Sequence, residues 1–254
     1  MTTTWKLLMG ACALSFSLLA QGQGVRVVPG SGMIDTPGHY VLVNDATQRS
    51  HGSAILITAS NVHLDLNGNA VTGPGGKNGV GIRVRGASGV TVTNGYIVNH
   101  AFGVIVENSN DVTLTKLQIR GEGLVVTAPP PETAIMIVQS RGVVVRNNTI
   151  YNTGLGVFVR GGRSGGNLIA GNTITGGTNA ILGICYNPAD GDPNGPRGDL
   201  IAENLISGFN IGVQFSDRSM ANISRGNTIA YRAMAFDIRN NTNKEVATES
   251  VQLP

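Results

Sequence analysis

Charged residues are scarce in this sequence, at 13% of its 254 residues, where about a quarter is usual in globular proteins. The formal net charge is only +3, and the arginines are scattered along the chain instead of forming runs. Proteins that bind nucleic acid normally concentrate basic residues in a patch or stripe. The composition therefore argues against nucleic acid as the main partner.

Cysteine and aromatic residues are also few, with two cysteines and 5% aromatic residues. Cys12 lies in a segment that we expect to be removed on export, which leaves Cys185 without an intramolecular disulfide partner. We predict that Cys185 occupies an inward strand position as a buried, inert thiol. Stability must then come from core packing and backbone hydrogen bonds.

Long apolar runs are absent apart from residues 7–20. Lys6 precedes this run, and the small residues Ala20 and Gly22 end it, which is the pattern of a secretory signal peptide. We predict that residues 1–22 are a signal peptide and that the mature chain is secreted or periplasmic. No later segment approaches the roughly 18 apolar residues of a membrane span.

Glycine, by contrast, is abundant, and Ile and Val recur in a fixed register. In each regular repeat, an Ile is followed seven residues later by another core-type residue. The five regular pairs are Ile97–Val104, Ile150–Val157, Ile174–Ile181, Ile206–Val213 and Ile229–Phe236, and insertions stretch Val71–Ile82 and Ile119–Ile135. Repetition at spacings of 22 to 24 residues indicates one supersecondary unit stacked many times, which is a solenoid.

An Asn accompanies this register, two residues before the first member of five pairs. These residues are Asn69, Asn148, Asn172, Asn204 and Asn227. Asn accepts tight bends and can hydrogen-bond to neighbouring backbone. We predict that the five side chains stack at one bend and link successive coils, a structural role.

The spacing of Val143, Val145, Asn148 and Ile150 also matches a leucine-rich repeat. That fold needs a helical return segment, whereas the return here, residues 151–156, is short, contains two glycines and leads directly into another strand. We therefore predict an all-β, right-handed, single-stranded parallel β-helix of seven to eight coils with three short strands per coil. Residues 23–60 would form an N-terminal strand and cap, residues 61–241 the β-helix and residues 242–254 a C-terminal tail.

One strand position leaves its register open. Val90, Val112 and Val143 occupy a place that becomes Asn167, Asp199 and Asn222 in later coils. A slip of one residue there would exchange the inward and outward faces of that strand.

The chain resembles the pectate-lyase-like β-helix superfamily, in its NosD-like branch. The resemblance rests on Pro37-Gly-His-Tyr40, Ile55-Leu-Ile57, Asn61-Val-His-Leu-Asp65 and the later Gly-Val-x-Val and Asn-Thr-Ile coils, and it covers residues 33–241. It implies the fold, while the superfamily includes lyases, hydrolases, epimerases and accessory proteins. The polygalacturonase and epimerase signatures are missing, so no catalytic residue is carried over.

Alternation along the strand after each return predicts which side chains point outward into a groove. The outward pairs are Arg83 and Arg85, Ile105 and Glu107, Met136 and Val138, Phe158 and Arg160, Leu182 and Ile184, Gln214 and Ser216, and Asp237 and Arg239. The middle of this face is apolar. An exposed apolar line on a monomer needs a cover, which leaves open a loop, self-association with a second chain, or the face of a sugar.

Two insertions offer such a cover. Residues 120–134 lengthen the return before the Met136 strand, and residues 186–199 follow the Leu182 strand. We predict that they rise on opposite walls of one groove about two coils apart. Long loops in a compact repeat are often functional, although shielding the apolar line is an equal alternative.

The second insertion contains one metal-like motif. Asp190, Asp192 and Asn194 place oxygen donors at alternate residues before a Gly, like the first half of a Ca²⁺ loop. The twelfth position, Ile201, cannot supply the expected carboxylate. These three residues are candidate Ca²⁺ ligands, with an ordinary surface loop as the alternative.

Three functions remain open. In the first, the protein binds an acidic polysaccharide and cleaves it by lyase or hydrolase chemistry, with Arg160 or Lys116 as the catalytic base. The predicted substrate-binding residues are Arg83, Arg85, Glu107, Phe158, Leu182, Asp237 and Arg239. Arginines would pair with uronate carboxylates, and Phe158 would stack on a sugar ring.

In the second, the protein is a noncatalytic exported scaffold that binds glycan or protein along the apolar line. In the third, which the NosD-like resemblance implies, it is an accessory factor for maturation of a copper enzyme. The four histidines, His39, His51, His63 and His100, show no ligand spacing, which weighs against copper. The sequence does not decide whether the protein is an enzyme.

Overall fold

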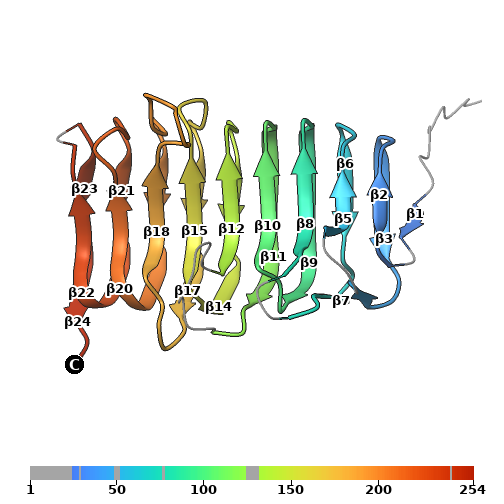
Figure 1. The fold of residues 1–254 in the computed structure, drawn as a ribbon, viewed down its shortest axis with the longest axis horizontal. Coiled ribbons are helices and arrows are strands. Elements are labelled where there is room, and N and C mark those ends of the chain that lie inside the picture. Colours follow the sequence, from blue (N-terminus) through green and yellow to red (C-terminus); the bar gives the residue numbers. More distant parts are fainter. Residues whose placement is uncertain (1–24, 29, 49–51, 76–77, 124–131, 241) are drawn as a thin grey trace, which may run out of the picture.

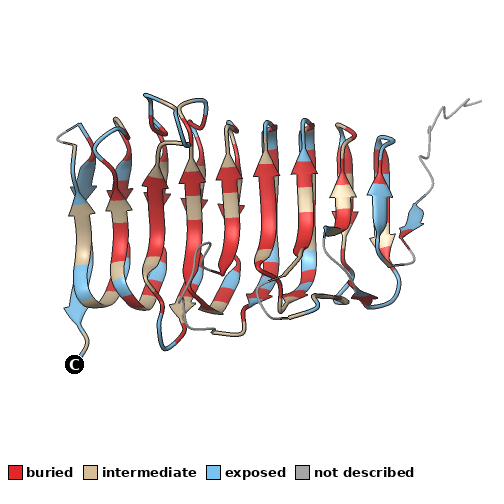
Figure 2. Cartoon of the chain, viewed as in Figure 1, coloured by how far each residue is buried: buried red, intermediate tan, exposed pale blue. Residues whose placement is uncertain are grey.

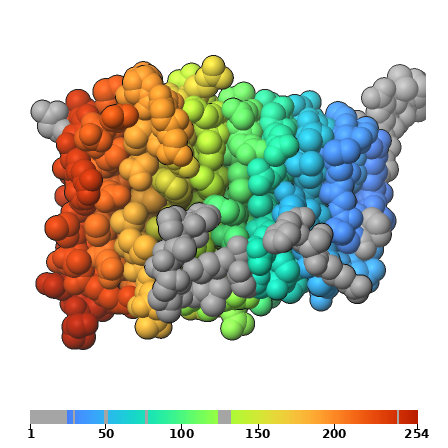
Figure 3. Space-filling model, in the orientation of Figure 1, coloured from blue at the N-terminus to red at the C-terminus, as the bar shows by residue number. Residues whose placement is uncertain are grey.

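The computed structural model describes residues 25–28, 30–48, 52–75, 78–123, 132–240 and 242–254. The predicted signal peptide, Cys12, His51 and the tip of the first insertion lie outside these residues. The described chain is a parallel β-solenoid of about nine turns without a helix, and its strands run in the same direction from coil to coil (Figure 1). Chain order follows the long axis from one end to the other (Figure 3). The predicted fold class is confirmed.

The strands form three faces. Face A, which contains the predicted groove, consists of β2 (Gly32–Ile34), β5 (Ser53–Ile57), β8 (Val80–Arg85), β10 (Phe102–Glu107), β12 (Thr133–Val138), β15 (Leu155–Arg160), β18 (Leu182–Asn187) and the second parts of β20 (Leu205–Phe215) and β22 (Thr228–Ile238). Each strand pairs with the strand one coil away.

Faces B and C complete each coil. Face B consists of β1 (Arg26–Val28), β3 (Gly38–Leu42), β6 (Val62–Asp65), the first parts of β9 (Ser88–Val98) and β11 (Asn110–Arg120), β13 (Val144–Arg146), β16 (Leu168–Ala170), β19 (Leu200–Ala202), β21 (Ile223–Arg225) and β23 (Lys244–Val246). Face C consists of β4 (Ala46–Thr47), β7 (Ala70–Thr72), the second parts of β9 and β11, β14 (Thr149–Thr153), β17 (Thr173–Gly176), the first parts of β20 and β22, and β24 (Glu249–Gln252).

The solenoid extends further at both ends than the predicted seven to eight coils. At the start, β1 pairs with β3 and β2 with β5, so residues 26–57 already form coil strands. At the end, β23 and β24 pair with β21 and β22. The predicted coil count is therefore slightly low, because these end strands lack the strong apolar alternation of the middle.

Stacked Ile and Val side chains fill the interior, and buried residues recur along the strands of successive coils (Figure 2). On face A the inward column includes Ile82, Val104, Ile135 and Val157, all fully buried and aligned in register. The second residue of every predicted pair lies in this column, with one exception. After Ile174 on face C, the residue that enters the column is Ile184 instead of Ile181, because the return between Ile174 and face A contains three more residues than the return after Ile150.

Glycine recurs where face A begins, because the backbones of successive coils approach closely there. A Cβ atom at Gly183 would lie 2.5 Å from the carbonyl oxygen of Gly212 in the next coil. Gly156 faces Gly183 in the same way. This contact explains why Gly precedes the inward residue on β8, β10, β15, β18 and β20.

The predicted Asn stack forms over four of its five members. Each side-chain oxygen accepts the backbone N–H of the residue one coil below: Asn148 from Leu117, Asn172 from Asn148, Asn204 from Asn172 and Asn227 from Asn204, at 2.9–3.0 Å. All four are buried. Asn69 is separated from them by two coils that carry Gly95 and Leu117 at this position, and it binds the Leu42 carbonyl.

A second polar ladder settles the open register. Val143, Asn167, Asp199 and Asn222 align without a slip, and all four are buried. The side-chain oxygens of Asn167, Asp199 and Asn222 each accept the backbone N–H of the coil below. The inward position therefore persists, and hydrogen-bonded polar side chains replace Val.

Candidate functional site

The outward side chains of face A form two rows. The first row carries Arg83, Ile105, Met136, Phe158, Cys185, Gln214 and Asp237, and the second carries Arg85, Glu107, Val138, Arg160 and Asn187. Four of the seven predicted outward pairs therefore take the predicted register in full. Gln214 and Asp237 take it as well, while their predicted partners Ser216 and Arg239 lie just past the ends of β20 and β22. The exception is the pair on β18.

On β18 the predicted assignments of Leu182, Ile184 and Cys185 are wrong. Ile184 points inward and is fully buried, and Cys185 takes the outward position beside Phe158. Leu182 pairs with Leu155, before the two outward rows begin. The three extra residues in the preceding return shift the whole strand.

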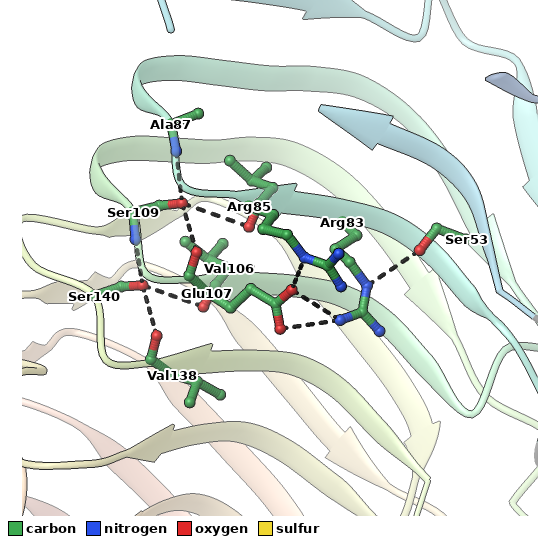
Figure 4. A network of polar contacts seen from close by, with 10 residues as sticks. Ser53, Arg83, Arg85, Ala87, Val106, Glu107, Ser109, Val138 and Ser140 are labelled. Atoms are coloured by element: carbon green, nitrogen blue, oxygen red, sulfur yellow. Dashed lines mark hydrogen bonds and ion pairs between the residues drawn. The ribbon is translucent and has the colours of Figure 1, made fainter. Parts of the chain in front are cut away.

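One end of the outward rows is a compact ion-pair network (Figure 4). The Arg83 guanidinium donates to both carboxylate oxygens of Glu107 at 2.9 and 3.0 Å, and Arg85 forms an ion pair with the same carboxylate. Ser53 accepts from Arg83, and Ser109 donates to the Glu107 carbonyl. Partial burial acts to raise the pKa of Glu107, but the hydrogen bonds from Arg85 and Arg83 outweigh it and hold this pKa below its ordinary value.

The other end of face A repeats this pairing. Asp237 accepts from Arg239 at 2.7 Å and from Gln214 at 2.8 Å. The hydrogen bond from Arg239 is the main reason why the pKa of Asp237 is lowered. Both carboxylates on the described strands of face A, Glu107 and Asp237, are thus bound to arginine.

The middle of face A is apolar but mostly covered. Ile105 is 5% exposed and Cys185 is fully buried, while Met136 and Phe158 are half-buried. Burial raises the pKa of the Cys185 thiol far above its ordinary value. The predicted apolar line is therefore a partly covered strip. The Arg160 guanidinium lies 5.5 Å from the centroid of the Phe158 ring, so this pair offers the strip's main polar and aromatic surface.

The second insertion folds beside this strip and continues past the ends of the strands, where it projects at the top of Figure 1. Asp190 forms an ion pair with Arg160 at 2.8 Å. Asp192 accepts from the backbone N–H of Gly162, from the side chain of Gln139 and from the backbone N–H of Asn194. These contacts anchor the loop to the turns that follow β12 and β15.

Two of the three candidate Ca²⁺ ligands, Asp190 and Asp192, therefore already have protein partners. The hydrogen bonds from Gly162, Asn194 and Gln139 lower the pKa of Asp192. Ca²⁺ binding by Asp190, Asp192 and Asn194 stays a prediction.

The first insertion begins and ends on the opposite side of face A from the second (Figure 1). At its base, the Glu132 carboxylate accepts the backbone N–H groups of Glu122 and Gly123 at 2.8 and 3.2 Å. Residues 124–131 lie outside the described residues. Opposite placement of the two insertion bases is confirmed.

The structure does not bring the two predicted catalytic bases together. Lys116 lies at the bend of β11 between faces B and C, with a left-handed backbone (φ 54°) and an exposed side chain. Arg160 lies on face A and is bound to Asp190. A guanidinium is a hydrogen-bond donor only, so this arrangement supplies no proton acceptor.

Sequence reasoning missed a polar depression beside face A, in the turns between faces A and B. It has a volume of about 340 Å³ and is lined by Asn108, Asn110, Gln139, Arg141 and Arg163. The side chains of Arg141 and Arg163 are exposed. Turn residues do not alternate as strand residues do, so the sequence cannot predict where their side chains point. The lining residues are seen to be close together only once the loop is anchored through Asp192.

The solved structures that resemble this chain are right-handed β-helix proteins. A tailspike protein 2 enzymatically active domain of bacteriophage CBA120 has a TM-score of 0.61 at 13% identity, over 91% of this chain and 39% of that one. An alginate lyase from Paenibacillus has a TM-score of 0.61 at 15% identity, over 85% of this chain and 89% of that one. An exopolygalacturonase from Thermotoga maritima has a TM-score of 0.61 at 11% identity, covering 91% and 72%. These similarities define the class as a right-handed parallel β-helix.

Family membership is more specific. The family model described as periplasmic copper-binding protein (NosD) matches residues 59–248, and the chain belongs to this family. No curated protein sequence matches the chain. The described residues contain no helical segment capable of spanning a lipid bilayer.

The family description names copper, so the histidines are relevant. His39 and His63 lie on adjacent coils with ring centroids 5.4 Å apart. His100 is buried, its Nε2 is bound to the Val71 carbonyl, and burial lowers its pKa to about 4. Within the described ranges, no three His, Cys, Asp or Glu side chains are grouped to hold a metal ion. These residues do not fit a copper site with three such ligands.

Proposed function

We propose that this chain is an exported protein that binds an acidic polysaccharide along face A without cleaving it. The observation that carries the proposal is the half-buried Phe158–Arg160 pair on face A, with further arginines toward both ends of the same face. Arginine recognises carboxylate groups, and an aromatic ring offers a flat apolar surface to a sugar. The β-helix fold, shared with a tailspike domain, an alginate lyase and an exopolygalacturonase, supports this choice of ligand.

The spacing of the acids argues for binding instead of hydrolysis. An inverting hydrolase needs two carboxyl groups about 6.5–9.5 Å apart, and a retaining one needs them about 5–5.5 Å apart. Glu107 and Asp237 are separated by five coil steps, or roughly 24 Å at about 4.8 Å per coil. For a lyase, the basic side chains of the described outward rows are all arginines, which are not proton acceptors, and the two carboxylates are bound to arginines.

Calorimetry and product analysis test this function. The protein is titrated with oligogalacturonate, oligoalginate and a neutral oligosaccharide of equal length, and the same mixtures are assayed for unsaturated products and new reducing ends. We expect saturable binding of an acidic oligosaccharide without products. Phe158→Ala and Arg160→Ala should each weaken it, while Arg146→Ala, an exposed arginine on face B, should not. Equally tight binding of the neutral oligosaccharide contradicts the proposal, and so does the appearance of any cleavage product.

Family membership favours a second candidate, an exported accessory protein for copper-enzyme maturation. The described histidines provide at most the His39–His63 pair for direct copper contact. Copper titration of the unaltered protein and of His63→Ala distinguishes the candidates. Binding that depends on His63, together with no glycan binding, favours the accessory role.

A further inference from the structure

The polar depression lies where three successive turns meet. Asn108 belongs to the turn after β10, and Asn110 begins β11. Gln139 and Arg141 belong to the turn after β12, and Arg163 to the turn after β15. Its volume of about 340 Å³ falls at the small end of the range for small-molecule sites. It opens beside the strand ends of face A, next to the second insertion.

The arginines here differ from those on face A. Arg83, Arg85, Arg160 and Arg239 each have a carboxylate within 4.0 Å, whereas Arg141 and Arg163 form no such ion pair with any described residue. Asp192 attracts Arg163 electrostatically, but its oxygens are hydrogen-bonded to Gly162, Gln139 and Asn194 and form no ion pair with that arginine. The Asp111 carboxylate lies against Gly142. The depression therefore carries two exposed positive charges.

The lining is held in place by its own contacts. Gln139 donates to Asp192 at 3.1 Å and accepts the backbone N–H of Arg163 at 2.9 Å, so both ends of its amide are used. Gln139 thus positions the Arg163 turn instead of contacting a ligand. Asn108 and Asn110 remain as amides that can bind hydroxyl groups.

The positive charge continues along the same edge. Arg141, Gly165 and Arg197 follow one another in a ladder of single bridges between coils, which places Arg197 about 10 Å from Arg141 along the axis at about 4.8 Å per coil. Arg197 and the nearby Arg218 are exposed, and among the described residues they donate to backbone carbonyls, of Gly162 and Asp192 respectively. A row of this kind suits a ligand with repeating negative charges.

We propose that this depression is a subsite for one anionic sugar unit of the polysaccharide, with its carboxylate or sulfate held between Arg141 and Arg163. The inference rests on the proposed function and gives it a second anchoring point beside face A. Asn108 and Asn110 contact the hydroxyl groups of the same unit. Arg197 and Arg218 guide the continuing chain.

The test is calorimetry on Arg141→Ala, Arg163→Ala and the face B control Arg146→Ala. Each is titrated with an unsulfated uronic-acid oligosaccharide, a sulfated oligosaccharide without carboxylates, and a neutral oligosaccharide. We expect Arg141→Ala and Arg163→Ala each to weaken binding of an acidic oligosaccharide on the order of tenfold, without a change in melting temperature. The control variant Arg146→Ala should bind it with the affinity of the unaltered protein. Arg141→Lys should recover only part of the loss, because it keeps the charge but not the planar fork.

The acidic oligosaccharide whose affinity falls in Arg141→Ala and Arg163→Ala shows whether the subsite holds a carboxylate or a sulfate. Full affinity in both alanine variants, with binding lost in Phe158→Ala, overturns the subsite and leaves the proposed function standing. If the unaltered protein binds no acidic oligosaccharide, both proposals fail. Equal weakening by Arg146→Ala also overturns the subsite, since it would reflect overall charge alone.

Discussion

Asn167 donates two hydrogen bonds to Asp199, one from its backbone N–H and one from its side-chain amide, both 2.9 Å long. Asp199 is 2% exposed and stands in a ladder whose neighbouring positions are Asn167 and Asn222. Burial is the largest influence on its pKa, which is raised from 3.8 to about 6 despite the hydrogen bonds from Asn167. A buried carboxyl thus occupies a position that an amide fits.

We predict that Asp199→Asn stabilises the protein at pH 8. A carboxyl whose folded pKa is raised binds its proton more tightly in the folded state, so its contribution to stability is present below pH 4 and is lost as the pH rises through about 6. The loss is on the order of 3 kcal/mol. Urea denaturation should show a clear gain for Asp199→Asn at pH 8 and little gain at pH 4. A variant less stable than the natural protein at pH 8 contradicts this role.

Asn172→Ala should destabilise the protein by about 2–4 kcal/mol. Asn172 accepts from the backbone and side chain of Asn148 and donates to the Val145 carbonyl, all within the buried interior. Its removal leaves these groups without partners. Asn210→Ala, on an exposed position of β20, serves as the control and should change stability by less than about 0.5 kcal/mol in the same urea titration.

Glu107→Gln should leave stability almost unchanged, because partly exposed ion pairs contribute about 1 kcal/mol or less. It should increase affinity for an acidic oligosaccharide several-fold, since it releases Arg83 and Arg85 from their carboxylate partner. Calorimetry at two salt concentrations checks this, and the gain should shrink at high salt. Unchanged affinity would place the ligand away from β8 and β10.

Cys185 should resist thiol reagents at pH 8 in the folded protein and react rapidly in urea. Its side chain is fully buried although it takes an outward position, and burial raises the pKa of the thiol. The measurement uses a chain with Cys12 replaced by Ser, so that one thiol is counted. Rapid labelling without denaturant would show that the strip beside Phe158 is open.

The sequence predicts the fold and most of face A because stacking forces a strict periodicity on the chain. A side chain such as Val157 or Ile135 can reach the core only at one phase of the coil, so the Ile-to-Val step reveals both the repeat and its outward residues. The outward residues of β18 are predicted wrongly because the seven-residue spacing does not reveal extra residues in the return before that strand. The Ile174–Ile181 spacing matched by chance.

The contacts of the candidate site could not be predicted in the same way. Alternation places Arg83, Arg85 and Glu107 outward, but their ion pairs depend on side-chain conformations across neighbouring coils. The depression at Arg141 and Arg163 depends on turns that have no period and on a loop that Asp192 anchors across two coils. Such contacts arise from the path of the folded chain.

The most direct test of glycan binding without cleavage is one incubation of the purified protein with oligogalacturonate or oligoalginate, followed for complex formation and for products. The account predicts saturable binding that weakens with salt and with Phe158→Ala, while the oligosaccharide remains intact. Unsaturated ends or new reducing ends would contradict it, and so would the absence of binding to every acidic oligosaccharide.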